Sequence, residues 1–502
     1  PAGGTGDAAG VDGTDRHGDR RALLALGVAI AAFAVTLTVL ARWKTLALMP
    51  EWPFDLTFFH NLVWNVAEGN GYRQSASLHE PPGVFNETHF EPILLLAVLP
   101  YRLVPGLGTL LAVQAGLLAL GALGVYRLAR SGGASAGAAL GGGLLFLTWW
   151  PLWRMALADV RPLMWAIPFL LLCAAALREG RRTETLIWGV LACLCREEIP
   201  LLVAGLGLGA WFWRALPTTG TSLERRWLGV RLGLAAIVFL VAANTLRSNV
   251  TFYIRPDQWL ARLLAGDASE HLAQWGRTPG EMLGTRARFF LQWAVPVGFG
   301  ALLAPELLLG AVPLLVYLFS QAHEWAGWEG PYVHHSAPAL AFVAGAAALG
   351  ISRALGRLER GRARSVAGAL VLGIGILGHL AILRTQLTNV VGPEIAPWTQ
   401  QDARVVELHA LAAEVPPDAA VMADYGTVHV FSGRAHVYCY QQQELDPVAP
   451  SLPFTDPLLP AAPVQPTWAL VHVDHPDWAA RARAAGLREL RRGAEWALFG
   501  PG

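Results

Sequence analysis

The chain has 502 residues, of which 54% are hydrophobic and 15% charged, and its formal net charge is +1. A soluble protein of this length would need more charge to cover its surface, so a soluble globular enzyme is excluded. The near-neutral balance also gives no reason to expect a nucleic-acid partner. Apolar runs of about 20 residues recur, which is the length that crosses a bilayer. We therefore expect an α-helical polytopic membrane protein.

The N-terminal region predicts how the chain enters the membrane. Residues 1–20 are rich in Gly, Asp and Thr and are expected to be disordered. The apolar run 22–41 follows Arg16, Arg20 and Arg21, which predicts a first span with a cytoplasmic N-terminus.

A large loop, 42–105, is then expected on the outer side. Within it, 54–67 has the spacing of an amphipathic helix that lies at the membrane interface. The run 90–101 is apolar but too short to cross, which favours a re-entrant or surface-lying helix.

Ten further apolar runs complete a transmembrane domain at 21–387 with about eleven spans. They are expected at 107–128, 134–150, 162–177, 185–195, 201–213, 230–246, 289–304, 307–320, 337–351 and 366–383. Arginine clusters fall on alternate connections, as this topology requires. From residue 388 to 502 the composition becomes that of a small α/β domain, which this count places outside the cell.

Asp55 is the first candidate catalytic residue. A carboxylate between Phe54 and Leu56 near a membrane interface is costly to desolvate, which suits a general base. An Asp before a helical run is equally typical of a helix N-cap. Both interpretations remain open from the sequence.

His89 and Glu91 stand at the start of the next apolar run. Their separation of two residues does not place them on one helix face, but a loop that leads into a helix can bring them together. They are candidates for substrate contact or for orienting Asp55, and capping is the structural alternative for Glu91.

Three consecutive charges, Arg196, Glu197 and Glu198, interrupt an apolar stretch. Ionisable groups in a membrane usually face a cavity and pair with a partner, so Arg196 is a candidate for binding a lipid-linked phosphate. Arg161, close to Asp159, is a second candidate. A solvated turn and a surface ion pair are the respective alternatives.

Tyr332, His334 and His335 form a last aromatic and histidine cluster, for which substrate contact and a plain structural loop are both considered. No spacing in the chain matches a metal motif, so no metal ligands are assigned and a divalent metal is optional. Four polar residues of the C-terminal region are interpreted as structural: Asp424, His429, Asp474 and His475.

Several short motifs in order resemble a family of bacterial and archaeal membrane proteins of the domain of unknown function 2079 type. These motifs are Phe54-Asp55, His89 to Pro92, Gln114, Tyr126 to Arg130, Arg196 to Glu198, Pro331 to His335, and Phe431 to Arg434 with Val437-Tyr438. The resemblance covers nearly the whole chain.

That family looks like a branch of the GT-C glycosyltransferase superfamily. The resemblance implies a polyprenyl-phosphate-sugar donor, an acceptor on the extracytoplasmic side of the bacterial inner membrane, and Asp55 as the acidic residue of the first outer loop. A lipid or glycolipid transporter and a non-catalytic scaffold remain alternatives. Sugar, acceptor and oligomeric state stay open.

Overall fold

A computed structural model describes residues 8–48, 53–76, 90–157, 159–212, 222–246, 297, 300–312, 333–357, 402–440 and 464–502, together with the helical residues 366, 368–370, 373, 375, 377 and 378. The side chains of 8–16, 222, 244–246 and 333–336 lie outside this description. The chain divides into two compact units. The helical unit comprises Pro1–Leu37, Gln114–Ala156 and Arg161–Gln386, and the mixed unit comprises Thr38–Val113, Leu157–Val160 and Leu387–Gly502.

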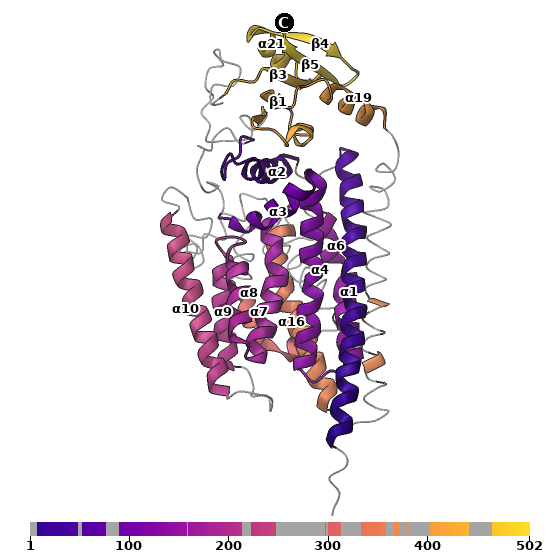
Figure 1. Cartoon of the computed structure of the whole chain (residues 1–502), viewed down its shortest axis with the longest axis vertical. Coiled ribbons are helices and arrows are strands. Elements are labelled where there is room, and N and C mark those ends of the chain that lie inside the picture. Colours follow the sequence, from indigo (N-terminus) through magenta and orange to yellow (C-terminus); the bar gives the residue numbers. More distant parts are fainter. Residues whose placement is uncertain are drawn as a thin grey trace, which may run out of the picture. The chain divides into compact units, whose positions relative to one another are not determined.

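The helical unit is built from apolar helices that pack side by side (Figure 1). The longer helices that lie wholly or mainly in it are α1 (Ala8–Leu46), α4 (Leu107–Ser131), α5 (Ala136–Thr148), α6 (Trp150–Leu157), α7 (Ala166–Glu179), α8 (Arg182–Cys193), α9 (Ile199–Gly209), α10 (Ser222–Leu246) and α16 (Val333–Arg357). Short turns of helix lie between them: η2 (Pro162–Trp165), η3 (Ala210–Phe212), η4 (Gly300–Leu303), α14 (Pro305–Leu308) and η5 (Leu309–Ala311).

Helix α7 and the preceding η2 form the centre of this unit, since 94% of the residues from Pro162 to Glu179 are buried. The corresponding values for α1 and α10 are 17% and 28%, so these helices leave most of their apolar surface exposed. Exposed leucine and valine faces on such helices suit contact with lipid. Helices α9 and α10 approach each other closely, and this requires a glycine at position 207. A Cβ there would lie 2.4 Å from the backbone oxygen of Gly229.

Five helices among the described residues are long and apolar enough to cross a membrane. They are His17–Leu46, Leu107–Ser131, Pro162–Glu179, Leu223–Ala243 and Ala337–Arg357. Shorter apolar helices occupy Ala136–Thr148 and Ile199–Phe212, where two more spans were expected. The polytopic class is confirmed, whereas the number eleven stays a prediction because 289–296, 313–320 and most of 366–383 lie outside the described residues. Helix α1 begins at Ala8 and so includes residues that were expected to be disordered.

The C-terminal part of the mixed unit is a five-stranded sheet in the order β2-β1-β3-β5-β4. The strands are β1 (Val421–Ala423), β2 (Val437–Cys439), β3 (Trp468–His472), β4 (Leu487–Arg492) and β5 (Trp496–Pro501). Strand β1 pairs in parallel with β2 and β3, while β5 pairs antiparallel with β3 and β4. The small α/β domain expected from the sequence is therefore present.

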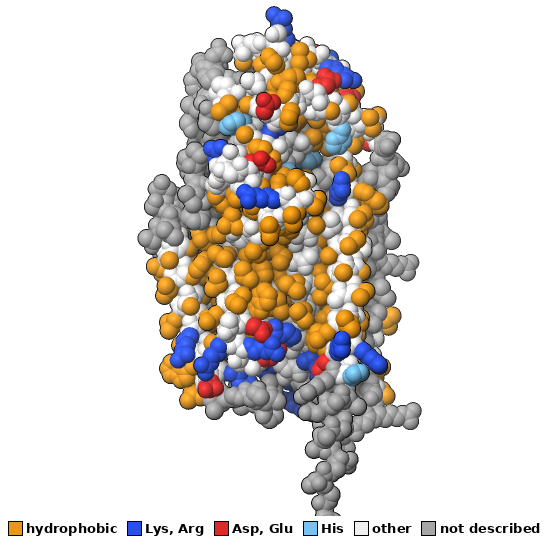
Figure 2. Space-filling view, viewed as in Figure 1, with side chains coloured by type: hydrophobic (Ala, Val, Ile, Leu, Met, Phe, Trp, Pro, Cys, Tyr) orange, Lys and Arg blue, Asp and Glu red, His pale blue; other side chains and the backbone are white. Residues whose placement is uncertain are grey.

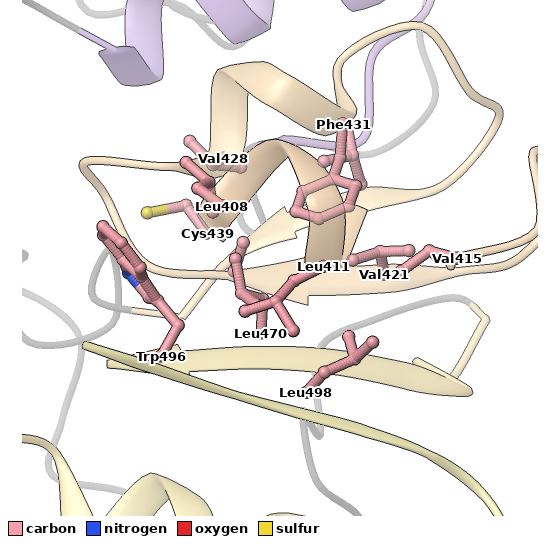
Figure 3. Close-up of a cluster of buried hydrophobic side chains, with 12 residues drawn as sticks. Leu408, Leu411, Val415, Val421, Val428, Phe431, Cys439, Leu470, Trp496 and Leu498 are labelled. Carbon is pink, nitrogen blue, oxygen red and sulfur yellow. The ribbon is translucent and has the colours of Figure 1, made fainter. Parts of the chain in front are cut away.

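Helices cover both faces of this sheet. On one face, α21 (Pro476–Ala484) buries Trp478 and Ala482 against the strands. On the other face, α19 (Ala403–Ala412) and η8 (Val428–Phe431) close a second apolar core, in which Leu411 and Phe431 meet strand residues such as Leu470 (Figure 3). Successive side chains of a strand point to opposite faces of the sheet, so apolar residues on both faces must be covered by helices.

The mixed unit also contains part of the first large loop. Helices α2 (Pro53–Ala67), η1 (Pro92–Leu94) and α3 (Leu95–Leu103) belong to it. Helix α2 packs against α3 and against η8 of the C-terminal domain. The structure therefore groups the loop with the C-terminal domain, whereas the sequence division assigned it to the transmembrane domain.

Candidate functional site

Asp55 lies inside the first turn of α2, half-buried. The helix already includes Pro53, so the N-cap interpretation of Asp55 is wrong. A negative charge in the first turn is favourable because the backbone N–H groups there are directed toward it. The sequence correctly predicted a helix here, but α2 is buried along most of its length rather than on one side.

Helix α3 packs against α2 on one side and exposes apolar side chains on another side. Its buried side chains, Ala97 and Tyr101, are one helical turn apart. Its exposed side chains Leu95, Leu99 and Leu103 follow the same spacing and are 49%, 69% and 76% exposed. An uncovered leucine stripe of this kind is typical of a helix that contacts lipid, and the choice between a re-entrant and a surface-lying helix stays a prediction.

Glu91 is buried just before η1, with 2% of its surface exposed. The Tyr72 hydroxyl donates a hydrogen bond of 2.9 Å to the backbone oxygen of Glu91. Burial, and then the nearby Glu91 charge, raise the pKa of Tyr72 well above its usual value. His89 lies outside the described residues, so its relation to Glu91 stays a prediction.

The triplet Arg196-Glu197-Glu198 forms the turn between α8 and α9. Arg196 Nε lies 3.2 Å from Glu198 Oε1, and these two side chains are only 8% and 13% exposed. Glu197 is buried as well. The alternative of a solvated outer turn is therefore wrong: three charges are enclosed within an apolar unit.

Arg161 begins the turn that leads into α7, and Gln114 of α4 holds this turn. The Gln114 side-chain oxygen accepts hydrogen bonds from the backbone N–H of Arg161 at 2.8 Å and from Trp165 Nε1 at 3.3 Å. Gln114 is fully buried, and its amide nitrogen also donates to Met155. From the sequence, Gln114 was notable only as part of a family motif, because a lone glutamine in an apolar run carries no spacing signal.

A network of ion pairs closes one end of the helical unit. Arg127 on α4 bonds Glu179 at 2.6 Å and Glu184 at 2.8 Å, and Arg130 bonds Asp19 of α1 at 2.9 Å. Further arginines at the same end are Arg178, Arg181, Arg182, Arg225 and Arg353. Figure 2 shows apolar side chains along the helices and Lys and Arg gathered below them. We call this region the basic end.

The candidate residues of the helical unit lie at the other end of their helices. Gln114 is about 24 Å along α4 from Arg130, at 1.5 Å per residue. Helix α8 has 12 residues, so its two ends are about 18 Å apart, with Arg182 at one and the Arg196 turn beyond the other. Arg161 precedes α7, whereas Glu179 ends it. Residues far apart in the sequence therefore share the end opposite to the basic end.

The remaining candidates are resolved only in part. Tyr332 lies outside the described residues, and His334 and His335 are described only as backbone of the first turn of α16. Within the described ranges, no group of three or more His, Cys, Asp or Glu side chains is arranged to hold a metal.

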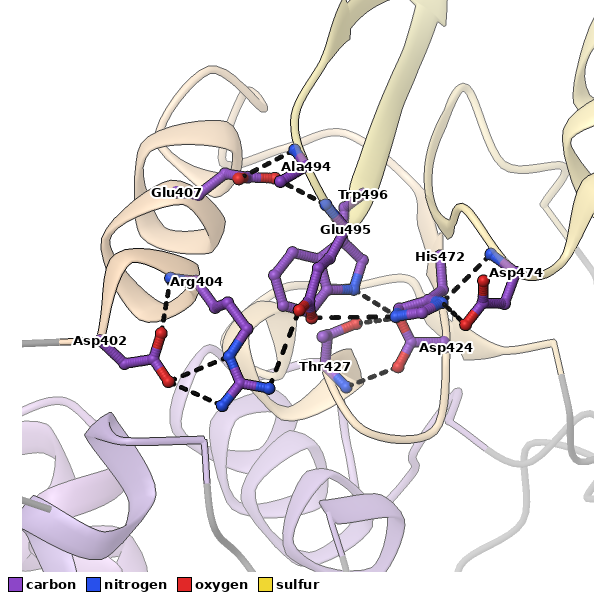
Figure 4. Close-up of polar contacts among 10 residues, drawn as sticks. All are labelled: Asp402, Arg404, Glu407, Asp424, Thr427, His472, Asp474, Ala494, Glu495 and Trp496. Atoms are coloured by element: carbon purple, nitrogen blue, oxygen red, sulfur yellow. Dashed lines mark hydrogen bonds and ion pairs between the residues drawn. The ribbon is translucent and has the colours of Figure 1, made fainter. Parts of the chain in front are cut away.

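Polar residues of the C-terminal domain bind one another (Figure 4). The Asp424 carboxylate accepts hydrogen bonds from the backbone and hydroxyl of Thr427, at 3.0 and 2.8 Å, and from Trp496 Nε1 at 3.2 Å. Burial raises the pKa of Asp424 despite these bonds. His472 Nδ1 lies 3.5 Å from Asp474 Oδ2. The bonds of Asp424 tie the loop after β1 to β5, which fits the structural role expected for it.

No curated protein matches the chain. Among solved structures, ArnT from Cupriavidus metallidurans bound to undecaprenyl phosphate is similar at 15% identity, with a TM-score of 0.49 and coverage of 93% of this chain and 97% of that chain. The Archaeoglobus fulgidus oligosaccharyltransferase in the apo form is similar at 14% identity, with a TM-score of 0.44 and coverage of 92% and 71%. The model of a family described as predicted membrane protein, DUF2079, matches residues 46–459, and the chain therefore belongs to the DUF2079 family of membrane proteins.

Proposed function

We propose that this protein is a membrane glycosyltransferase that transfers a sugar from a polyprenyl-phosphate-linked donor to an acceptor hydroxyl on the extracytoplasmic side. The observation that carries the proposal is the buried Arg196 turn at the end of the apolar helices opposite to the basic end. By the positive-inside rule the basic end is cytoplasmic, so Arg196 belongs to the extracytoplasmic side. We propose the bacterial inner membrane as its location, as the sequence resemblance to the GT-C superfamily implies.

Arg196 has the chemistry that a lipid-linked phosphate needs. A guanidinium presents several N–H donors in a plane and keeps its charge when desolvated, which suits a phosphate diester within an apolar setting. Its partner Glu198 holds one edge of the guanidinium through Nε. Arg161 is a second cation at this end of the unit. Both cations would offset the charge that develops on the departing phosphate.

Asp55 is the proposed general base. It takes the proton of the acceptor hydroxyl while that oxygen attacks the anomeric carbon, and the bond between this carbon and the phosphate oxygen breaks with inversion. Polyprenyl phosphate leaves with the bonding electron pair. Glu91 and His89 are proposed to orient Asp55 or the acceptor, and Glu197, Tyr332, His334 and His335 to contact the substrate.

The surroundings of Asp55 support a reaction close to lipid. Helix α2 packs on α3, whose exposed leucines Leu95, Leu99 and Leu103 suit contact with the bilayer surface. A base on α2 would then act near the depth at which a polyprenyl-linked phosphate resides. The sequence resemblance to the GT-C superfamily independently gives the acidic residue of the first outer loop this role.

The proposal is tested in cells of the source organism by replacing the native gene with the Asp55→Asn variant. We expect loss of one envelope glycan and accumulation of the polyprenyl-phosphate sugar, because the amide cannot accept the proton. Glu68→Gln is a matched control, since Glu68 is an exposed acid just after the other end of α2. Normal glycans and normal donor turnover in Asp55→Asn would reject the base assignment. If the polyprenyl-phosphate sugar accumulates only on the cytoplasmic face of the membrane, the result would favour the alternative function of a lipid or glycolipid transporter.

A further inference from the structure

Helix α2 is bound to the C-terminal domain by a buried side-chain amide. Asn61 Nδ2 donates hydrogen bonds to the backbone oxygens of Ser432 and Arg434, at 3.2 and 2.6 Å. Asn61 is fully buried, so these bonds are shielded from competing water. Ser432 and Arg434 follow η8, on the loop that leads into strand β2.

The same amide also organises the segment that follows α2. Asn61 Oδ1 accepts a hydrogen bond of 2.9 Å from the backbone N–H of Ser75. The Ser75 hydroxyl in turn accepts from the backbone N–H of Val437 at 2.9 Å and lies 3.2 Å from the Val437 oxygen. Strand β2 is the edge of the sheet, so Ser75 satisfies backbone groups that would otherwise be exposed there. One asparagine therefore connects α2, the segment around Ser75 and the loop before β2.

The first turn of α2 has its own contact with the C-terminal domain. The ring of Phe54 stacks on Tyr425, with centroids 6.3 Å apart and planes at 16°. Asp55 is the next residue. Asn61 lies about 9 Å further along the same helix, so the two contacts fix both the rotation and the axial position of α2.

We infer that Asn61 is a positioning residue, through which the C-terminal domain sets the position of Asp55. The inference rests on the proposed function, because it assigns Asp55 the base. A helix is stiff over two turns, so a change at Asn61 is transmitted to Asp55. Small displacements of a catalytic group are costly: about 1 Å can lower a rate by roughly a hundredfold. The C-terminal domain thus forms part of the active enzyme rather than a separate appendage.

Two matched variants of full-length protein in lipid vesicles separate positioning from stability. Asn61→Ala removes the bonds to the C-terminal domain. Asn65→Ala removes an equally buried asparagine one turn further along, whose bonds among the described residues stay within the first loop, to Asn61 and Asn70. We expect kcat for a polyprenyl-phosphate-sugar donor to fall by about tenfold to a hundredfold in Asn61→Ala, with KM unchanged. We expect Asn65→Ala to retain kcat per folded molecule.

A covalent tether provides a second readout. A Cβ on Gly433 would lie 3.8 Å from Trp64 Cδ1, so these two positions face each other where α2 meets the C-terminal domain. A short bis-methanethiosulfonate cross-linker can therefore join Trp64→Cys to Gly433→Cys. If Asn61 acts by position, cross-linking this pair in the Asn61→Ala background restores kcat, and reduction of the cross-link removes the gain.

The outcomes separate this inference from the proposed function. Unchanged kcat in Asn61→Ala, together with a large loss in Asp55→Asn, overturns the positioning role alone. An equal loss of kcat in Asn61→Ala and Asn65→Ala, without rescue by the tether, also overturns it. Unchanged turnover in Asp55→Asn overturns the base assignment and the positioning role together.

Discussion

His60 Nδ1 lies 2.6 Å from the hydroxyl oxygen of Ser432, although 372 residues separate the two in the sequence. The other ring nitrogen, Nε2, lies 3.0 Å from the Tyr101 hydroxyl. His60 thus connects α2 to the C-terminal domain on one side and to α3 on the other. Burial lowers the pKa of His60 to about 4, because the charged imidazolium would lose its hydration.

This burial predicts that the mixed unit loses stability in mild acid. His429 of the C-terminal domain is also buried, with its pKa lowered to about 4. An unfolded histidine titrates near 6.5, so the unfolded state binds more protons between pH 6.5 and 4. The contribution of these two histidines to the free energy of unfolding is fully present above pH 6.5, and it is lost as the pH falls from 6.5 towards 4. We expect a loss of about 2 kcal/mol per histidine at pH 5.

The measurement is hydrogen exchange of β1 and β2 in the full-length protein at pH 7.5 and pH 5, corrected for the intrinsic exchange rate. Exchange should be faster at pH 5, and His429→Asn should reduce the difference by about half. Equal protection at both pH values would contradict the assigned burial of the two histidines.

The sequence predicted local elements better than it predicted contacts. Periodicity located α2 and the short α3 because the spacing of a helix depends on residues close together in the chain, and the change in composition located the C-terminal α/β domain. The bonds from His60 and Asn61 to Ser432 could not be predicted, since a lone polar residue in an apolar helix gives no signal of its distant partner. Burial of Arg196 was also undecided, because the same three charges suit a solvated turn.

The topology expected from the distribution of arginines predicts that two sites are labelled from opposite sides of the membrane. Arg182 at the basic end is 63% exposed and Arg404 on α19 is 58% exposed. The four native cysteines are buried, so background labelling should be low. We expect Arg182→Cys to react with a membrane-impermeant maleimide only after the membrane is opened, and Arg404→Cys to react in intact spheroplasts. Reaction of both sites from the same side would contradict the topology.

Substitution of Arg196 is expected to weaken donor binding. Charge-assisted hydrogen bonds contribute about 1.5–3 kcal/mol each, so Arg196→Gln should raise KM for the polyprenyl-phosphate sugar by roughly tenfold to a hundredfold. Arg196→Lys should raise it less, because the charge is kept but the planar set of donors is lost. The measurement is donor saturation with protein in lipid vesicles.

Arg182→Gln is the matched control for Arg196. It removes an arginine at the other end of α8, where the side chain is exposed and 3.6 Å from Glu224. Exposed ion pairs contribute about 0–1 kcal/mol, so neither KM nor stability should change appreciably. An equal rise in KM for both variants would show that Arg196 does not contact the donor.

The central claim, that Asp55 is the base of a glycosyl transfer, is tested most directly with purified protein and a radiolabelled polyprenyl-phosphate sugar. A positioned general base contributes about a hundredfold to ten-thousandfold to the rate. We predict that Asp55→Asn retains donor binding but lowers transfer to the acceptor by such a factor, whereas Glu68→Gln behaves like the wild type. Transfer by Asp55→Asn at the wild-type rate would contradict the account.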